Sequence, residues 1–126
     1  MLPNRTVRRR VQGVELYLPW SHPLPDYARS RPTYGQNLVE LAAELASRLP
    51  VGERPLQMLD VGANIGDSAL QVSSRTGAQV LCVEADPYWL DYLNRNVGGR
   101  PDITIVAALL TPEARTDSSA TAVREH

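Results

Sequence analysis

Residues 58–67 (MLDVGANIGD) restrict the fold of this chain more than any other stretch. They join an apolar run of strand length, residues 56–61, to a helical segment, residues 67–76, through Gly62 and Gly66. Because glycine lacks a Cβ, Gly62 allows a sharp turn after the strand, and Gly66 allows close approach of a ligand or a neighbouring strand. The helix points its free N–H groups and the positive end of its dipole at this turn. The stretch therefore predicts an α/β fold with a ligand site at the carboxyl end of a strand.

Strand and helix patterns alternate after the turn. Residues 79–84 (QVLCVE) are an apolar run of strand length, and residues 103–110 (ITIVAALL) begin a third strand. Between them, Asp86 suits the N-cap and Pro87 the first position of a helix. Continuous apolar strands joined by helices indicate a parallel sheet buried on both faces, and right-handed crossovers place the strands in the order 3-2-1. We therefore expect a Rossmann-like, three-layer α/β fold, with a β-α-β-α-β unit over residues 51–110.

Residues 1–50 are expected to precede this core as a strand, a loop and a helix. Residues 11–18 partly alternate apolar and polar side chains, which predicts a strand or hairpin arm with one face made of Val14, Leu16 and Leu18. The next passage predicts an irregular loop, since proline fixes φ and lacks an N–H, and its prolines are Pro19, Pro23, Pro25 and Pro32. A solvated or frayed end is indicated by the early arginines, which are Arg5, Arg8, Arg9 and Arg10.

Residues 36–49 predict an amphipathic helix. The apolar face, which would pack on the core, consists of Leu38, Leu41, Leu45 and Leu49. The opposite face is polar and consists of Glu40, Glu44 and Arg48. At the other end of the chain, residues 111–126 are polar and lack periodicity, which is typical of a disordered tail.

Composition and charge indicate an ordinary globular domain. The 126 residues suffice for one domain and carry a formal net charge of −1, which indicates neither a nucleic acid nor a membrane partner. No run approaches the roughly 18 apolar residues that span a bilayer, and no apolar region follows the early arginines as in a secretory signal. The single cysteine, Cys82, forms no intramolecular disulfide and favours a reducing cytoplasm. No spacing of Cys, His, Asp or Glu suggests a metal site.

A carboxylate further along the chain complements the glycine turn. Glu84 ends the second predicted strand, 18 residues after Gly66, and in nucleotide-binding α/β folds an acid about 20 residues beyond the turn accepts hydrogen bonds from ribose hydroxyls. Asp60 ends the first strand and could attract an ammonium group. A dinucleotide site needs a second and a third glycine, but Asn64 and Asp67 stand there. The pattern therefore favours S-adenosylmethionine, which has a ribose, an ammonium group and no phosphate, over a dinucleotide.

At these residues the chain resembles the FkbM-type family of class I methyltransferases. Residues 59–68 (LDVGANIGDS) are similar to the family's cofactor loop, and residues 84–87 (EADP), with Leu90 and Asn96, to its second motif. The resemblance covers about residues 34–110 and implies an S-adenosylmethionine-dependent O-methyltransferase whose acceptor is a hydroxyl of a sugar, glycan or other small natural product. Pattern and resemblance together predict a cofactor site that consists of Asp60, Gly62, Ala63, Asn64, Gly66, Asp67, Glu84 and Ala85.

The chain departs from this family at two points. Ala85 stands where the family has proline, and the sequence stops after the third strand, whereas the family's sheet continues. We therefore expect the truncated N-terminal half of a class I methyltransferase sheet, with no catalytic residue assigned. The first strand would keep an exposed edge that invites pairing in a homodimer. Two alternatives remain open: a non-catalytic interaction module that uses this edge, and an NAD-dependent oxidoreductase domain.

Several side chains admit two interpretations. His22 is either a general base for a hydroxyl acceptor or a solvent-exposed loop residue. Trp20 and Tyr34 either cover the ligand as a lid or pack on the helix at residues 36–49. Cys82 lies in a buried strand pattern and is expected in the core. Aromatic residues that either stack near an adenine or pack in the core are Tyr88, Trp89 and Tyr92.

Overall fold

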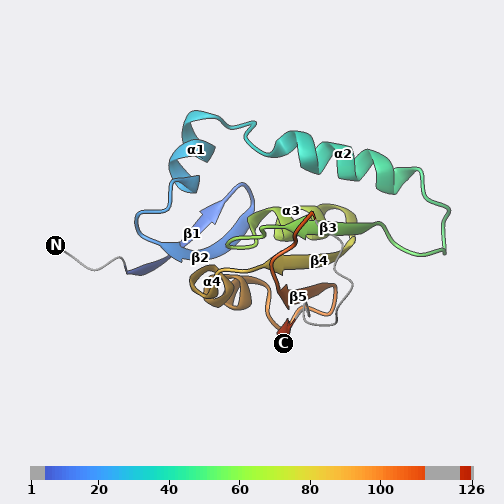
Figure 1. Cartoon of the computed structure of the whole chain (residues 1–126). Coiled ribbons are helices and arrows are strands. Elements are labelled where there is room, and N and C mark those ends of the chain that lie inside the picture. Colours follow the sequence, from blue (N-terminus) through green and yellow to red (C-terminus); the bar gives the residue numbers. More distant parts are fainter. Residues whose placement is uncertain (1–4, 113–122, 126) are drawn as a thin grey trace.

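The computed structural model describes residues 5–112 and 123–125. The N-terminal part is an antiparallel hairpin, followed by two helices: β1 (Thr6–Val11), β2 (Val14–Pro19), α1 (Leu24–Ser30) and α2 (Gln36–Ser47). The remaining part contains β3 (Gln57–Val61), α3 (Asp67–Thr76), β4 (Gln79–Glu84), α4 (Pro87–Val97), β5 (Ile103–Ala107) and β6 (Val123–Glu125). Figure 1 shows α1 and α2 along the top of the molecule, with α4 and β5 at the bottom.

The sheet has the predicted strand order. β3, β4 and β5 are parallel neighbours with β4 in the middle, so the three strands lie in the order 3-2-1 along the chain. The register pairs Leu59 with Leu81 and Glu84 with Ala107. Because the strands are parallel, their carboxyl ends meet at one end of the sheet, where the glycine turn also lies. The predicted topology is therefore confirmed.

The helices of the core begin and end where their sequences predict. Helix α3 spans the predicted residues and is bounded by two left-handed glycines, Gly66 with φ of 87° and Gly77 with φ of 71°. Helix α4 begins after Asp86, whose side chain accepts a hydrogen bond of 2.9 Å from the backbone N–H of Tyr88. Pro87 occupies the first turn, where its missing N–H has no cost.

The core lies between one face of the sheet and the layer of α3 and α4. Fully buried members of this core include Val72, Cys82, Leu93 and Val97, and the hairpin contributes Leu16 and Leu18. The predicted face of β2 is confirmed by these two leucines, beside the partly buried Val14.

The second face of the sheet is exposed over most of β3 and at Leu81 of β4, while Val83 on the same face is buried. The side chains of Leu59, Val61 and Leu81 are 58%, 54% and 39% exposed, and the strand register places them together on that face. Helices therefore cover one face of the sheet. A three-layer fold has a second helical layer on the other face, and residues 5–112 and 123–125 contain no such layer. β3 is the edge strand of this sheet, as the sequence predicts.

Two predictions for the N-terminal part are wrong. The early arginines are exposed to solvent, as predicted, but they do not belong to a frayed end, because three of them lie in β1, where Arg8 forms an ion pair with Glu15 of β2. The proline-rich passage is not wholly irregular, because it contains α1. Pro23 occupies the N-cap of this helix and Pro25 its first turn, where a residue without an N–H is tolerated. The two prolines therefore begin a helix instead of excluding one.

The apolar face predicted for α2 does not pack on the core. The helix packs on α3 and buries Val39 and Ala42 there. The four leucines of the predicted face, three in α2 and Leu49 just after it, are between 39% and 57% exposed: Leu38, Leu41, Leu45 and Leu49. Small side chains allow α2 to lie close to α3, whereas the larger apolar side chains stay substantially exposed.

The C-terminal segment is only partly described. Residues 123–125 form β6, which pairs antiparallel with β5 at the edge opposite β3, so the predicted disordered tail is wrong at these residues. Residues 113–122 and 126 lie outside the described part of the chain. Among the described residues, no helix is long and apolar enough to span a bilayer. No group of three or more His, Cys, Asp or Glu side chains in that part of the chain is placed to hold a metal ion.

Candidate functional site

The turn after β3 is held against the end of β4. The backbone N–H groups of Gly62 and Ala63 both donate to the carbonyl oxygen of Val83, over 2.8 and 3.1 Å. Gly62 has φ of 71°, a left-handed conformation that glycine adopts without strain. The chain therefore bends at the predicted position and crosses the carboxyl end of the neighbouring strand.

Glu84 reaches this turn. Its Oε1 accepts a hydrogen bond of 2.9 Å from the backbone N–H of Asn64, and its Oε2 accepts one of 2.9 Å from the backbone N–H of Asp86. The residue is 8% exposed. The structure thus brings Glu84 to the glycine turn, as the sequence pattern requires. Both carboxylate oxygens accept backbone hydrogen bonds, one from the turn after β3 and one from the segment after β4. Each oxygen keeps a further lone pair that can accept a hydrogen bond.

Asn64 occupies the centre of the turn, where a glycine would be expected. It has φ of 55°, in the left-handed region, which asparagine adopts more readily than most residues. Its backbone N–H binds Glu84 and its side-chain Oδ1 lies 3.1 Å from Nε2 of His22. Asn64 is therefore a contact point between the turn, β4 and the loop before α1.

A cavity of about 250 Å³ lies beside the turn. The turn and the start of α3 supply one wall, and the loop before α1, α1 itself and the loop before α2 supply the other. Lining residues from the predicted site are Asp60, Gly62, Ala63, Asn64 and Asp67. The opposite wall includes His22, Leu24, Tyr27 and Tyr34. Its volume is below the roughly 300–1,000 Å³ of a typical ligand pocket, so it suits one end of a larger ligand.

Asp60 carries an unsatisfied acceptor at this cavity. Its Oδ2 is buried and has no hydrogen-bond partner among the described residues. Burial, together with the smaller effect of the nearby charges of Asp67 and Glu84, raises the pKa of Asp60 from 3.8 to about 6. A buried carboxylate without a partner is costly. A cationic ligand group in the cavity would lower the electrostatic cost of this buried charge.

Asp67 makes the cavity acidic and occupies the start of α3. Burial raises the pKa of Asp67, while the backbone N–H groups of Asp67 and Ser68 and the nearby His22 lower it. The helix N-terminus thus already faces a carboxyl group of the protein. The two acids of the cavity favour a ligand group with positive charge over one with negative charge.

Gly66 has a different neighbour from the one predicted. A Cβ added there would lie 2.9 Å from Cδ1 of Leu93 and 2.9 Å from Cγ1 of Val97, both on α4. The close approach that requires glycine is therefore made by a helix of the core, not by a ligand or a strand. Of the predicted cofactor residues, Gly66, Glu84 and Ala85 do not line the cavity, although Glu84 contacts its wall through Asn64.

Asn96 holds the turn through hydrogen bonds of its side chain. In the sequence it stands out only as part of a family motif. Its side-chain Nδ2 donates to the carbonyl oxygens of Ile65, at 2.7 Å, and Tyr17, at 2.9 Å, and its Oδ1 accepts from the N–H of Tyr17 at 2.6 Å. An asparagine on an otherwise apolar helical face is a signal that could have identified this role. One side chain thus links α4, the turn and β2.

The structure brings His22 into the candidate site. Its ring lies edge-on to Trp89 with the centroids 5.6 Å apart, and its Nδ1 accepts a hydrogen bond of 3.1 Å from the N–H of Leu24. The side chain is partly buried, so the interpretation as a solvent-exposed loop residue is wrong.

The other aromatic residues divide between site and core. Tyr34 lines the cavity and stacks with Tyr27, consistent with a lid, whereas Trp20 is 60% exposed and lies under Arg9. Tyr92 is buried, with its hydroxyl 2.8 Å from the hydroxyl of Thr6. Tyr88 and Trp89 pack edge-on against each other on the same helix.

Cys82 is a core residue, as predicted. It is fully buried, and burial raises the pKa of its thiol to about 12, so the thiolate is not available as a nucleophile at neutral pH.

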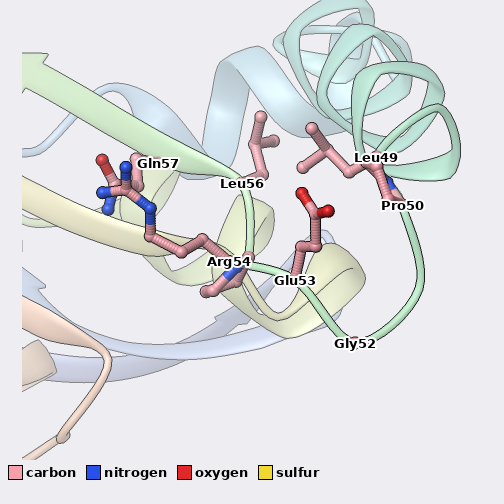
Figure 2. Close-up of a pocket in the computed structure, with 8 residues that line it drawn as sticks. Leu49, Pro50, Gly52, Glu53, Arg54, Leu56 and Gln57 are labelled. Carbon is pink, nitrogen blue, oxygen red and sulfur yellow. The ribbon is translucent and has the colours of Figure 1, made fainter.

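A second hollow lies at the opposite end of the sheet. It has a volume of about 720 Å³ and is formed by the connection between α2 and β3 (Figure 2). Figure 2 shows Leu49 and Leu56 pointing toward one another, while the side chain of Arg54 extends toward Gln57. This hollow is remote from the carboxyl ends of the strands, where α/β folds bind their ligands. We therefore place the candidate site at the glycine turn.

Comparison with known proteins identifies the fold. No protein-family model and no curated protein matches the chain. An S-adenosylmethionine-dependent methyltransferase from Agrobacterium tumefaciens is similar over 85% of this chain and 34% of its own, with 16% sequence identity and a TM-score of 0.58. A "putative transferase" from Pyrococcus horikoshii is similar over 82% of this chain and 36% of its own, with 17% identity and a TM-score of 0.54.

The chain thus spans 34% and 36% of the length of these two proteins. Identities this low establish the fold alone. Together with the parallel strand order and the turn that contacts Glu84, they show that the chain has the Rossmann-like α/β fold of S-adenosylmethionine-dependent methyltransferases, in a short version with three parallel strands.

Proposed function

We propose that this chain binds S-adenosylmethionine across the glycine turn and forms the cofactor-binding half of a methyltransferase. The observation that supports this most directly is the buried, unpartnered Oδ2 of Asp60 at the cavity. The amino-acid end of the cofactor carries an ammonium group, which would neutralise this carboxylate from the cavity. The ribose would then lie toward Glu84, whose carboxylate oxygens retain accepting lone pairs.

The remaining residues of the site position this ligand. Asn64 and Glu84 hold the turn and the end of β4 at a fixed separation through their 2.9 Å hydrogen bond. Tyr27 and Tyr34 line the cavity opposite the turn and restrict the access of water to Asp60. S-adenosylmethionine supplies an electrophilic methyl group when it is bound, so positioning contributes much of the rate of such a transfer.

We extend the proposal to O-methylation of a hydroxyl on a sugar, glycan or other natural product, which is what the FkbM-type resemblance implies. The chain corresponds to about a third of the length of its structural neighbours. Residues outside the described part, or another polypeptide, would then supply the acceptor pocket, and we expect weak cofactor binding and little turnover by this chain alone. The single buried cysteine fits a reducing cytoplasm.

Calorimetric titration with S-adenosylmethionine and with its demethylated product tests the proposal. Wild type should bind both ligands, and Glu84→Gln and Glu84→Ala should bind them roughly 10-fold more weakly, since hydrogen bonds to a charged acceptor contribute about 1.5–3 kcal/mol. The matched control is Glu53→Ala, which removes an acid from the remote hollow of Figure 2 and should leave binding unchanged. Equal heats for wild type and both Glu84 variants would remove Glu84 from the site.

A second candidate function rests on the exposed edge strand. β3 has no neighbour on its outer side among the described strands, and the adjoining sheet face exposes Leu59 and Val61. We propose as the alternative a non-catalytic interaction module in which these residues pair with a second copy of the chain. Light scattering discriminates the two functions, because a stable dimer without any response to S-adenosylmethionine would favour the module.

An oxidoreductase domain that binds NAD is the third candidate, and the cavity opposes it. A pyrophosphate at the turn would meet the carboxyl groups of Asp60 and Asp67. Thermal-shift measurements with NAD and with S-adenosylmethionine separate the two ligands. A larger stabilisation by NAD would reverse our preference.

A further inference from the structure

The loop before α1 contacts the glycine turn through the side chain of His22. Its two ring nitrogens have different partners: Nδ1 lies 3.1 Å from the backbone nitrogen of Leu24, and Nε2 lies 3.1 Å from Oδ1 of Asn64. A backbone N–H can only donate, so Nδ1 is the accepting nitrogen. The neutral ring then carries its hydrogen on Nε2 and donates it to Asn64.

This assignment excludes His22 as a free general base. In the neutral ring both nitrogens are occupied by hydrogen bonds, and the only basic lone pair, on Nδ1, is turned toward the backbone of Leu24. The ring is also fixed from the side, because it packs edge-on against Trp89 at a centroid distance of 5.6 Å and an interplanar angle of 87°. Both features hold the imidazole in one orientation.

The partner of His22 is the residue on which the cofactor turn depends. Asn64 has the left-handed φ of 55°, and its backbone N–H donates to Glu84. Fixing the side chain of Asn64 also restricts its backbone, and therefore the direction of the N–H that Glu84 accepts. His22 thus acts on the end of β4 through two successive hydrogen bonds, His22 to Asn64 and Asn64 to Glu84.

We propose that His22 is a positioning residue that closes the cavity at the turn and orients Asn64 for the ligand. This inference rests on the proposed binding of S-adenosylmethionine at the same site. The N-terminal segment then contributes to ligand affinity, because the loop before α1 lines the cavity and holds the turn in place. His22 itself is not a catalytic residue in this assignment.

Two conservative variants separate the contacts of His22. In His22→Gln the side-chain amide can reach the position of Nε2 and donate to Asn64, whereas in His22→Asn the shorter side chain can only replace Nδ1 near Leu24. His22→Gln should bind S-adenosylmethionine within about 2-fold of wild type, and His22→Asn and His22→Ala should bind about 3- to 10-fold more weakly, as the loss of one hydrogen bond implies. Circular dichroism and thermal melts establish that each variant is folded.

A spectroscopic readout tests the contact without the ligand. In ¹⁵N-labelled wild type, the imidazole nitrogens should show a hydrogen on Nε2, and the side-chain amide of Asn64 should keep its resonance in His22→Gln but shift in His22→Asn. Equal affinities of wild type, His22→Asn and His22→Ala would overturn the inference and leave the proposed function standing, as would equal weakening in His22→Gln and His22→Ala. Absence of any binding by wild type would overturn both.

Discussion

The backbone N–H of Asn64 and the Oε1 atom of Glu84 are joined by a hydrogen bond of 2.9 Å, although 20 residues separate them in the chain. This bond connects the turn after β3 to the last residue of β4. It meets the geometric condition that the sequence imposes on a nucleoside site, namely that the glycine turn and the distant acid converge. Several further contacts around this bond lead to testable expectations.

Replacing Gly66 by alanine should destabilise the protein strongly. The added Cβ would lie 2.9 Å from side-chain atoms of both Leu93 and Val97, and the φ of 87° is itself unfavourable for alanine. We expect the free energy of unfolding to fall by about 2–4 kcal/mol. In Gly52→Ala, the control, φ is similar at 84° but no atom lies within 4 Å, so the loss should be about 1 kcal/mol. Equal losses in urea titrations would show that the contact with α4 is unimportant.

Replacing Asp60 by asparagine should change how stability depends on pH. The pKa of Asp60 is raised from 3.8 to about 6 by burial, so the folded protein binds this proton more tightly than the unfolded chain. The associated stability is complete below the unfolded value, 3.8, and is lost as the pH rises through about 6. Relative to Asp60→Asn, wild type should lose about 1–2 kcal/mol over this interval, after allowance for partial solvent access.

Thermal melts of both proteins at a series of pH values check this expectation. A difference between wild type and Asp60→Asn that stays constant from pH 4 to pH 7 would contradict the raised pKa.

The same substitution should weaken cofactor binding. An ammonium group favours the ionised carboxylate, so the affinity of wild type for S-adenosylmethionine should rise with pH up to about 6 and then level off. Asp60→Asn should bind about 10-fold more weakly above this pH and show no such rise. Titrations at pH 5 and pH 7.5 measure both effects, and a pH-independent affinity in wild type would argue against an ammonium group at Asp60.

Asn96 should be a determinant of stability. Asn96→Ala removes three hydrogen bonds to Tyr17 and Ile65, and we expect a loss of about 2–3 kcal/mol. Asn94→Ala is the matched control, because its side chain bonds only the carbonyl oxygen of Leu90 one turn earlier in the same helix. Chemical denaturation compares the two, and a similar effect of both substitutions would assign the cost to the helix instead of the link.

Association through the open strand edge should depend on β3. If the edge pairs in solution, the mass from light scattering should exceed 13.9 kDa for wild type and return to that value for Leu59→Lys, because a lysine opposes edge pairing. Leu41→Lys is the control, since it places the same charge on the exposed leucines of α2. The reverse pattern, with Leu41→Lys alone monomeric, would move the interface to α2.

The sequence predicts those parts of the fold that depend on local chemistry. The three parallel strands, the bounds of α3 and the N-cap at Asp86 follow from apolar runs, glycines and capping residues that act within a few positions. The exposure of the α2 leucines could not be predicted, because periodicity locates an apolar face but does not show whether a partner covers it. Likewise, α1 was missed because Pro25 is compatible with the first helical turn as well as with a loop.

For the candidate site, the sequence places Asp60, Asn64 and Glu84 in one region but does not reveal how they are held. The sequence predicts that Glu84 faces a ribose, whereas the bonds that the structure gives it come from two backbone N–H groups. The second wall of the cavity comes from residues more than 25 positions earlier, and no spacing rule connects them to the turn. Long-range side-chain contacts of this kind become visible only with coordinates.

The bridge formed by Asn96 has a consequence for the smallest unit that can fold. Its amide occupies the edge of β2 at Tyr17 in the manner of an adjacent strand, while the same Nδ2 holds the carbonyl of Ile65. A shortened protein that began at β3 would lose two of the three hydrogen bonds of this amide and would expose the apolar surface that Leu16 and Leu18 cover. The hairpin is thus as much a part of this folding unit as the strands that flank the glycine turn.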